Sequence, residues 1–197
     1  AYIGMSQITN QPASEKLSYT YMLDLYEAAG NTKMIRQLNQ YPVLEDDAQI
    51  QPYFISLLRD RTMHALGIGT MHGMKSVVTG IFLPVFESRA YTLGEKINIW
   101  RAKAFLRSDT SLLDELLSTD LTFIVPELKI PVYFISGTYD YTVSYELSKQ
   151  YFDTLQAPVK GFYTFEQSAH TPLFEEPAKF MEVMREDVLK GGAGTAD

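Results

Sequence analysis

The sequence contains no cysteine, which excludes disulfide bonds and thiolate metal sites. It also has no apolar run of about 18 residues, the length that a membrane-spanning helix requires. Positive charge is scarce: 17 Lys and Arg residues stand against 24 Asp and Glu residues, which leaves a net charge of −7. This balance argues against binding to nucleic acid or to an anionic membrane surface. No His, Asp and Glu residues have the spacing of metal ligands, so we expect neither a metal ion nor a cofactor.

A Gly-x-Ser-x-Gly motif, the turn that carries the nucleophile in many serine hydrolases, is also absent. Ser6 comes nearest to it, because Gly4 lies two residues before. However, Ile8 stands where the second small residue is required, and a polar segment follows instead of a helix. We therefore interpret Ser6 as a strand-end serine that faces a pocket, and we predict no nucleophile within these residues.

Hydrophobic residues make up 46% of the 197 residues and charged residues 21%, values typical of a globular domain rather than a disordered chain. The first residues have neither the basic region nor the long apolar core of a secretory signal peptide. Together with the absence of cysteine, this predicts a cytoplasmic location. Residues 1–6 are apolar and have no element before them, so we expect a short buried strand that begins in the middle of a domain.

The long segment that follows is predicted to be almost entirely helical. Its first apolar residues recur at helical spacing and end at a glycine: Leu17, Tyr21, Leu25, Ala28 and Gly30. Further helices are predicted at residues 32–41, 46–67 and 111–117, and a glycine-rich loop or broken helix at 67–80. Thr92-x-x-Glu95 is a capping box that starts another helix. We expect this helix to bury a stripe formed by Ile97, Trp100 and Ala104.

The pattern changes after Pro126. Residues 130–136 form a continuous apolar run, which is typical of a parallel strand buried on both faces. A helix is predicted at 144–155, a second strand at 161–165 and a closing helix that begins near Pro177. Strand, helix and strand at this spacing predict a right-handed parallel crossover, and therefore an α/β fold.

Asp140 and His170 follow the two predicted strands, at the edge where open α/β sheets bind their ligands. A carboxylate and an imidazole in these places are what a serine hydrolase uses to orient and operate its general base. Each residue alone is explained as a turn or strand-end residue, but the pair favours two members of a catalytic triad. His64, late in a predicted helix, is explained by the carbonyl ends of that helix. His72, in the glycine-rich segment, is a candidate for substrate contact.

The sequence IPVYFISGTYDYTV at residues 130–143, followed by QSAHTPLFEEP at 167–177, resembles the end of an α/β-hydrolase. The similarity is greatest to the proline iminopeptidase-like branch. In that family the aspartate follows a Gly-x-x-Asp turn after the seventh strand and the histidine follows the eighth strand. Gly137-x-x-Asp140 and His170 match both motifs, in the same order.

The resemblance implies the C-terminal part of an α/β-hydrolase sheet, with parallel strands, flanking helices and a large helical cap. Residues 1–10 would be a core strand and 11–125 the cap. Residues 126–190 would be the C-terminal part of the core, and 191–197 a flexible tail. The N-terminal half, with five strands, the nucleophile turn and the oxyanion-hole loop, would then lie outside the chain.

The resemblance also implies a serine hydrolase that cleaves an amide or ester through an acyl-enzyme, acting on a small ester or a short peptide. His170 would be the general base and Asp140 would fix its tautomer, while the missing part would supply the nucleophile. By itself the chain is expected to be inactive. His72 and Trp100 are the candidate substrate contacts, within an apolar cap lining predicted from Met63, Met71, Met74, Phe82, Phe86, Tyr91 and Trp100.

Two other hypotheses stay open from the sequence. The chain would be a non-catalytic ligand-binding or regulatory fragment that retains the cap, or one half of a split or nicked enzyme. An isolated set of three parallel strands would expose a sheet edge and an apolar face. The expected partner is therefore the N-terminal half of the same protein or a second copy of the chain.

Overall fold

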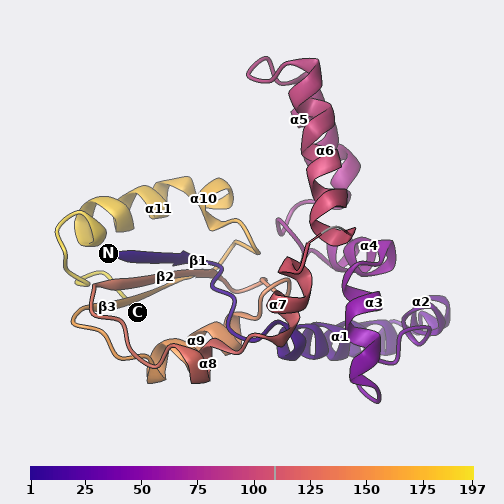
Figure 1. The fold of residues 1–197 in the computed structure, drawn as a ribbon, viewed down its shortest axis with the longest axis horizontal. Coiled ribbons are helices and arrows are strands. Elements are labelled where there is room, and N and C mark those ends of the chain that lie inside the picture. Colours follow the sequence, from indigo (N-terminus) through magenta and orange to yellow (C-terminus); the bar gives the residue numbers. More distant parts are fainter. Residues whose placement is uncertain (109) are drawn as a thin grey trace.

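The computed structural model describes residues 1–108 and 110–197 (Figure 1). These residues form an α/β fold, as predicted, in which a parallel sheet is flanked by helices and carries a helical cap. The sheet has the order β1-β2-β3, with bounds Tyr2–Met5, Val132–Gly137 and Lys160–Phe165. Its strands run parallel with their carboxyl ends toward the cap, and both chain termini lie at the opposite end (Figure 1).

The central strand β2 is buried along its whole length, which confirms the prediction of a strand covered on both faces. One face packs on α8 (Leu121–Ile124) and α9 (Tyr145–Thr154). The other packs on α10 (Pro172–Glu175), α11 (Pro177–Val183) and a π turn, η3 (Met184–Val188). Alternate residues of the strand serve the two cores, with Val132 and Phe134 on the α9 side and Tyr133 and Ile135 on the α11 side.

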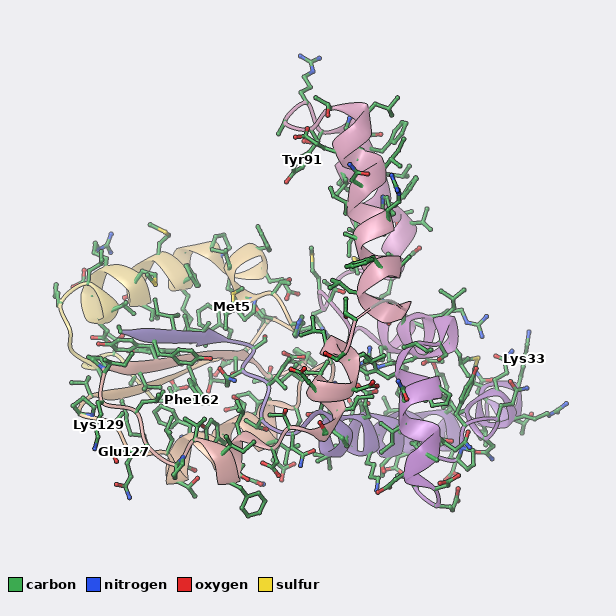
Figure 2. The ribbon with its side chains drawn as sticks, viewed as in Figure 1. Met5, Lys33, Tyr91, Glu127, Lys129 and Phe162 are labelled. Atoms are coloured by element: carbon green, nitrogen blue, oxygen red, sulfur yellow. The ribbon has the colours of Figure 1, made fainter. Side chains whose placement is uncertain are left out.

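Strand β1 is an edge strand in the described structure, where it pairs with β2 alone. Its side chains Tyr2, Ile3 and Met5 are each 39% exposed (Figure 2 labels Met5). The outer side of β1 therefore presents backbone groups and apolar side chains with no strand beside them.

The cap contains the helices that lie between β1 and α8 along the chain, and its two ends meet at one place. The side-chain amide of Asn10 donates to the Asp120 carboxylate at 2.8 Å, and Leu121 N donates to Thr9 O at 2.9 Å. The elements are α1 (Gln11–Ala28), α2 (Thr32–Leu38), η1 (Asp47–Gln49), α3 (Ile50–Phe54), α4 (Leu57–Leu66), η2 (Val78–Phe82), α5 (Leu83–Glu87), α6 (Leu93–Ser108) and α7 (Leu112–Ser118). None of the described helices has the length and hydropathy that crossing a bilayer requires.

Helix α1 lies where the apolar spacing predicts a helix, but it buries a different face. Leu17 and Leu25 are exposed, whereas Tyr19 and Met22 enter the cap core. The buried face also carries polar residues, namely Gln11, Ser14, Glu15 and Ser18. The reason is that this face meets an arginine from α4 and the turn after β2, which give the polar groups their partners.

The prediction of one helix over residues 46–67 is wrong, because the segment is divided into η1, α3 and α4. The break lies at Ser56, whose hydroxyl donates to Tyr53 O at 2.7 Å and accepts from Arg59 N at 3.2 Å. A serine that bonds in this way ends one helix and caps the next. At the other end, Gly67 closes α4 in the left-handed conformation, with φ of 75°.

Helices α5 and α6 form a hairpin that projects from the rest of the cap (Figure 1). The capping box at its turn is confirmed, since Thr92 N donates to the Glu95 carboxylate and Glu95 N donates to the Thr92 hydroxyl. The predicted buried stripe is wrong for Ile97 and Ala104, which are exposed. On the same helix, the half-buried Trp100 contacts η2, where its ring lies 5.4 Å from that of Phe82.

The C-terminal segment 191–197, expected to be flexible, is bonded to the end of the sheet. The buried carboxylate of Asp187 accepts hydrogen bonds from Tyr163, from Gly194 N and from both the amide and the hydroxyl of Thr195. The last residue, Asp197, donates its amide to Phe162 O and accepts from Thr164 N on β3. Burial by itself raises the pKa of Asp187, but the donors from Thr195, Tyr163 and Gly194 outweigh it and hold the pKa below its usual value.

Replacing Asp187 with asparagine is expected to lower the free energy of unfolding by about 2 kcal/mol at neutral pH, because charge-assisted bonds to a buried carboxylate are lost. Since the folded pKa of Asp187 is depressed, its contribution is present above the unfolded pKa of about 3.9 and is lost as the pH falls through the folded pKa. Urea unfolding at several pH values measures both effects. Glu186→Gln, on the same turn but paired with solvent-accessible Arg185 and Lys190, is the control and should change little.

Candidate active site

Asp140 and His170 lie at the same edge of the sheet, because they follow the carboxyl ends of the adjacent parallel strands β2 and β3. The two loops approach closely at Gly137, the last residue of β2. A Cβ atom at this position would lie 2.2 Å from Ala169 O and 2.3 Å from Ser168 O. Only glycine therefore allows the loop that carries His170 to reach Asp140.

The Asp140–His170 pair is hydrogen-bonded, with 3.0 Å between His170 Nδ1 and Asp140 Oδ2. The other carboxylate oxygen of Asp140 accepts from Val143 N at 2.9 Å, so the side chain is held at both oxygens. Because a carboxylate only accepts, Nδ1 of His170 carries the proton and Nε2 is left as the basic nitrogen. Asp140 is buried at 2% exposure, whereas the His170 side chain is 31% exposed. This is the geometry of a general base and the carboxylate that orients it.

Ser6 lies at the end of β1, beside the same loop. Its hydroxyl donates to the main-chain oxygen of His170 at 2.9 Å, and the residue has a left-handed φ of 50°. The side chain is thus bonded to the backbone of the histidine rather than to its ring. In the described arrangement Ser6 anchors the His170 loop to the edge strand, and the left-handed backbone is a local strain maintained at this place.

The sequence did not point to Glu176, which fixes the His170 loop from the other side. Its carboxylate accepts from Gln167 N at 2.9 Å and from the Ser168 hydroxyl at 2.6 Å. The available signal was the Glu175-Glu176-Pro177 sequence at the start of α11, because acidic side chains at such places often accept from free backbone amides.

The structure places His72 beside the Asp140 turn. Its ring stacks on Tyr139 with 3.7 Å between ring centroids, and its Nδ1 donates to Gly67 O at 2.8 Å. Tyr139 directly precedes Asp140 in the chain. His72 therefore belongs to the surroundings of the pair, although it comes from the cap.

Trp100 lines a cavity of about 310 Å³ in the cap. Two residues of the lining lie near the Asp140–His170 pair. Thr142 follows Asp140 by two residues in the chain. Thr70 O accepts a hydrogen bond from the hydroxyl of Thr171, the residue after His170. The other lining residues are Arg59, Asp60, Met63, His64, Gly69, Val77, Ile81 and Ile99. Met63 belongs to the lining as expected, whereas Phe86 and Tyr91 are exposed on the projecting hairpin (Figure 2 labels Tyr91 at its tip).

His64 is buried and both of its ring nitrogens are bonded locally. Nε2 accepts from Thr70 N at 3.2 Å, so Nδ1 carries the proton and donates to Asp60 O at 2.5 Å. His64 therefore connects α4 with the segment that leads to His72, and its role is structural. Among the residues that the structure describes, no group of three or more His, Asp or Glu side chains could hold a metal ion.

A buried ion pair joins the cap helices to the turn after Asp140. The guanidinium of Arg59 donates to both oxygens of Glu15, at 2.7 and 2.5 Å. Gln11 donates to the same carboxylate at 2.7 Å and to Thr142 O at 2.9 Å. Burial by itself lowers the pKa of Arg59, but the Glu15 carboxylate outweighs it and the pKa is raised. The pair joins α1 to α4, and Gln11 extends this connection to the loop of the candidate site.

Two curated proteins resemble the chain in sequence. "Probable aminopeptidase YbaC" of Bacillus subtilis (strain 168) is 29% identical over 191 residues, which cover 93% of this chain and 55% of that protein. "Putative esterase/lipase 1" of Mycoplasma genitalium is 31% identical over 86 residues, which cover 44% of this chain and 31% of that protein. No family model matches the chain, and no solved structure matches it significantly. The chain thus spans about half the length of the aminopeptidase and a smaller share of the second relative.

Proposed function

We propose that the chain is part of a serine hydrolase of the α/β-hydrolase fold, in its proline iminopeptidase-like branch, that cleaves an amide or ester. The observation that carries the proposal is the Asp140–His170 hydrogen bond at the carboxyl ends of adjacent parallel strands. The names of both curated relatives, an aminopeptidase and an esterase or lipase, denote hydrolytic enzymes and support it.

In the proposed mechanism, Nε2 of His170 takes the proton from a serine hydroxyl while the oxygen attacks the substrate carbonyl. The imidazolium is stabilised by Asp140, which accepts from Nδ1 throughout. His170 then returns the proton to the leaving amine or alcohol, and the acyl-enzyme is hydrolysed by water with the same base. Asp140 does not take the proton itself, because its function is to fix the tautomer and to stabilise the charge.

The nucleophile and the oxyanion-hole amides are proposed to come from a part of the protein outside these 197 residues. The length of the aminopeptidase relative supports this, since the matched region covers only 55% of it. Residues 1–10 and 126–190 would belong to the hydrolase core and residues 11–125 to its cap. The bond between Asn10 and Asp120, which closes the base of the cap, agrees with this division.

The substrate class we propose is a small ester or a short peptide. The cap cavity beside Thr142 has a volume of about 310 Å³, in the range of small-molecule sites, and its lining combines Trp100 and aliphatic side chains with polar ones. His72 stacks on Tyr139, which directly precedes Asp140, and would contact the substrate near its reacting carbonyl.

The test uses the complete protein that contains this chain. We expect it to hydrolyse p-nitrophenyl esters or aminoacyl p-nitroanilides, and to be labelled by a fluorophosphonate probe at a serine outside these residues. Peptide mass spectrometry locates the label. A label on Ser6 would contradict the proposed source of the nucleophile, and the absence of both hydrolysis and labelling would refute the proposed reaction.

A further inference from the structure

We propose that Glu175 is a positioning residue that clamps the cap segment Gly67–His72 to the loop carrying His170. The clamp would fix the position of the cap relative to His170, the proposed general base. The catalytic consequence of the clamp rests on the proposed function, whereas the clamp itself can be measured without any activity.

The two carboxylate oxygens of Glu175 accept from two different parts of the fold. Oε2 accepts from Ala169 N, the residue before His170, at 2.9 Å. Oε1 accepts from His72 N, in the cap, at 2.5 Å. One ionised side chain thus connects amides that lie about 100 residues apart in the sequence, and each bond is strengthened by its charge.

The cap segment also contacts both loops of the candidate site independently of Glu175. On the His170 side, the hydroxyl of Thr171 donates to Thr70 O at 3.0 Å. On the Asp140 side, Tyr141 N donates to Ile68 O at 3.3 Å. The stacking of His72 on Tyr139 adds a further contact beside Asp140.

The position of the segment between the two loops has a mechanical consequence. Because residues 67–72 contact both the Asp140 loop and the His170 loop, a displacement of this segment would pull at both ends of the Asp140–His170 hydrogen bond. A displacement of about 1 Å in a catalytic group is enough to reduce a rate about 100-fold. Glu175 contributes the charge-assisted hydrogen bond among the contacts between residues 67–72 and the His170 loop.

The chain provides a matched control in the neighbouring residue. Glu176 is also a glutamate with two hydrogen bonds, but both described partners, Gln167 N and the Ser168 hydroxyl, belong to the His170 loop itself. Glu175→Gln and Glu176→Gln therefore make the same chemical change, since an amide keeps one acceptor and places an NH₂ group against the second donor. Only the first change breaks the connection to the cap.

Hydrogen–deuterium exchange of the complete protein measures the clamp. In Glu175→Gln we expect exchange in the peptide covering residues 67–75, and in the one covering 166–174, to become at least about tenfold faster. In Glu176→Gln only the second peptide should respond. Steady-state kinetics measures the consequence, and we expect kcat of Glu175→Gln to fall about 10- to 100-fold with KM nearly unchanged.

The outcomes separate the clamp from the proposed function. Unchanged exchange of residues 67–75 in Glu175→Gln would overturn the clamp, whatever the activity of the protein. Faster exchange of both peptides with an unchanged kcat would overturn the positioning part and leave a structural contact. If the wild-type protein hydrolyses nothing, the proposed function fails, and the exchange data still decide whether the clamp exists.

Discussion

Replacing His170 with asparagine in the complete protein is expected to lower kcat by about 10⁵-fold or more, with a much smaller effect on KM. The change removes the basic nitrogen Nε2, and enzymes that lose the general base of a triad lose most of their acceleration. The hydrogen bond from Nδ1 to Asp140 is lost as well. Initial rates with an ester substrate, together with the rate of fluorophosphonate labelling, measure the loss.

The matched control for this experiment is Gln167→Ala, three residues earlier in the same loop. The Gln167 side chain is exposed and its described contact is made by the backbone amide, so the substitution should leave kcat nearly unchanged. Melting curves of both variants establish that they are folded. A folded His170→Asn protein with wild-type kcat would show that this histidine is not the general base.

Replacing Glu15 with glutamine is expected to lower the free energy of unfolding by about 3–5 kcal/mol, the largest effect on stability that we expect from a single substitution here. Glu15 is 0% exposed and Arg59 is 5% exposed, so the buried guanidinium would lose its bidentate carboxylate partner and keep the longer contact with Asp60 at 3.4 Å. Guanidinium chloride unfolding, followed by far-UV circular dichroism, measures the change.

Two further variants test whether the loss of stability in Glu15→Gln comes from the unbalanced buried charge. Asp47→Asn breaks the pair between Lys16 and Asp47, whose side chains are 37% and 79% exposed, and should change the stability little. The double variant Glu15→Leu with Arg59→Met removes both charges, and should be much less destabilised than Glu15→Gln. If Glu15→Gln were as stable as the wild type, the pair would not be holding the cap helices together.

The α/β part of the fold could be predicted from the sequence because its signals are local. Residues 130–136 form an apolar run long enough for one buried strand, and the helix and strand that follow are separated by clear turns. The buried face of α1 could not be predicted in this way. Hydrophobic periodicity selects Leu17 and Leu25, whereas the burial of Glu15 depends on Arg59, which lies 44 residues away along the chain.

The hairpin of α5 and α6 also differs from what hydrophobic periodicity predicts. Periodicity identifies the apolar stripe of a helix, but it does not say whether another element covers that stripe, and Ile97 is exposed in the described structure. The pairing of Asp140 with His170 was accessible because parallel strands bring their carboxyl ends together. The contacts of Glu175 were not accessible, since one of its partners is a backbone amide of the cap and carries no side-chain signal.

The pairing of β1 with β2 has a consequence for the order in which the chain folds. Tyr2 pairs with Val132 and Met5 with Ile135, so the two strands are separated along the chain by the whole cap. During synthesis, residues 2–5 leave the ribosome long before their partner strand exists. Closing a loop of this length is entropically costly, and early formation of the cap, whose ends meet at Asn10 and Asp120, shortens the distance that remains. Once the ends of the cap have met, the chain that still has to be closed between β1 and β2 is therefore short.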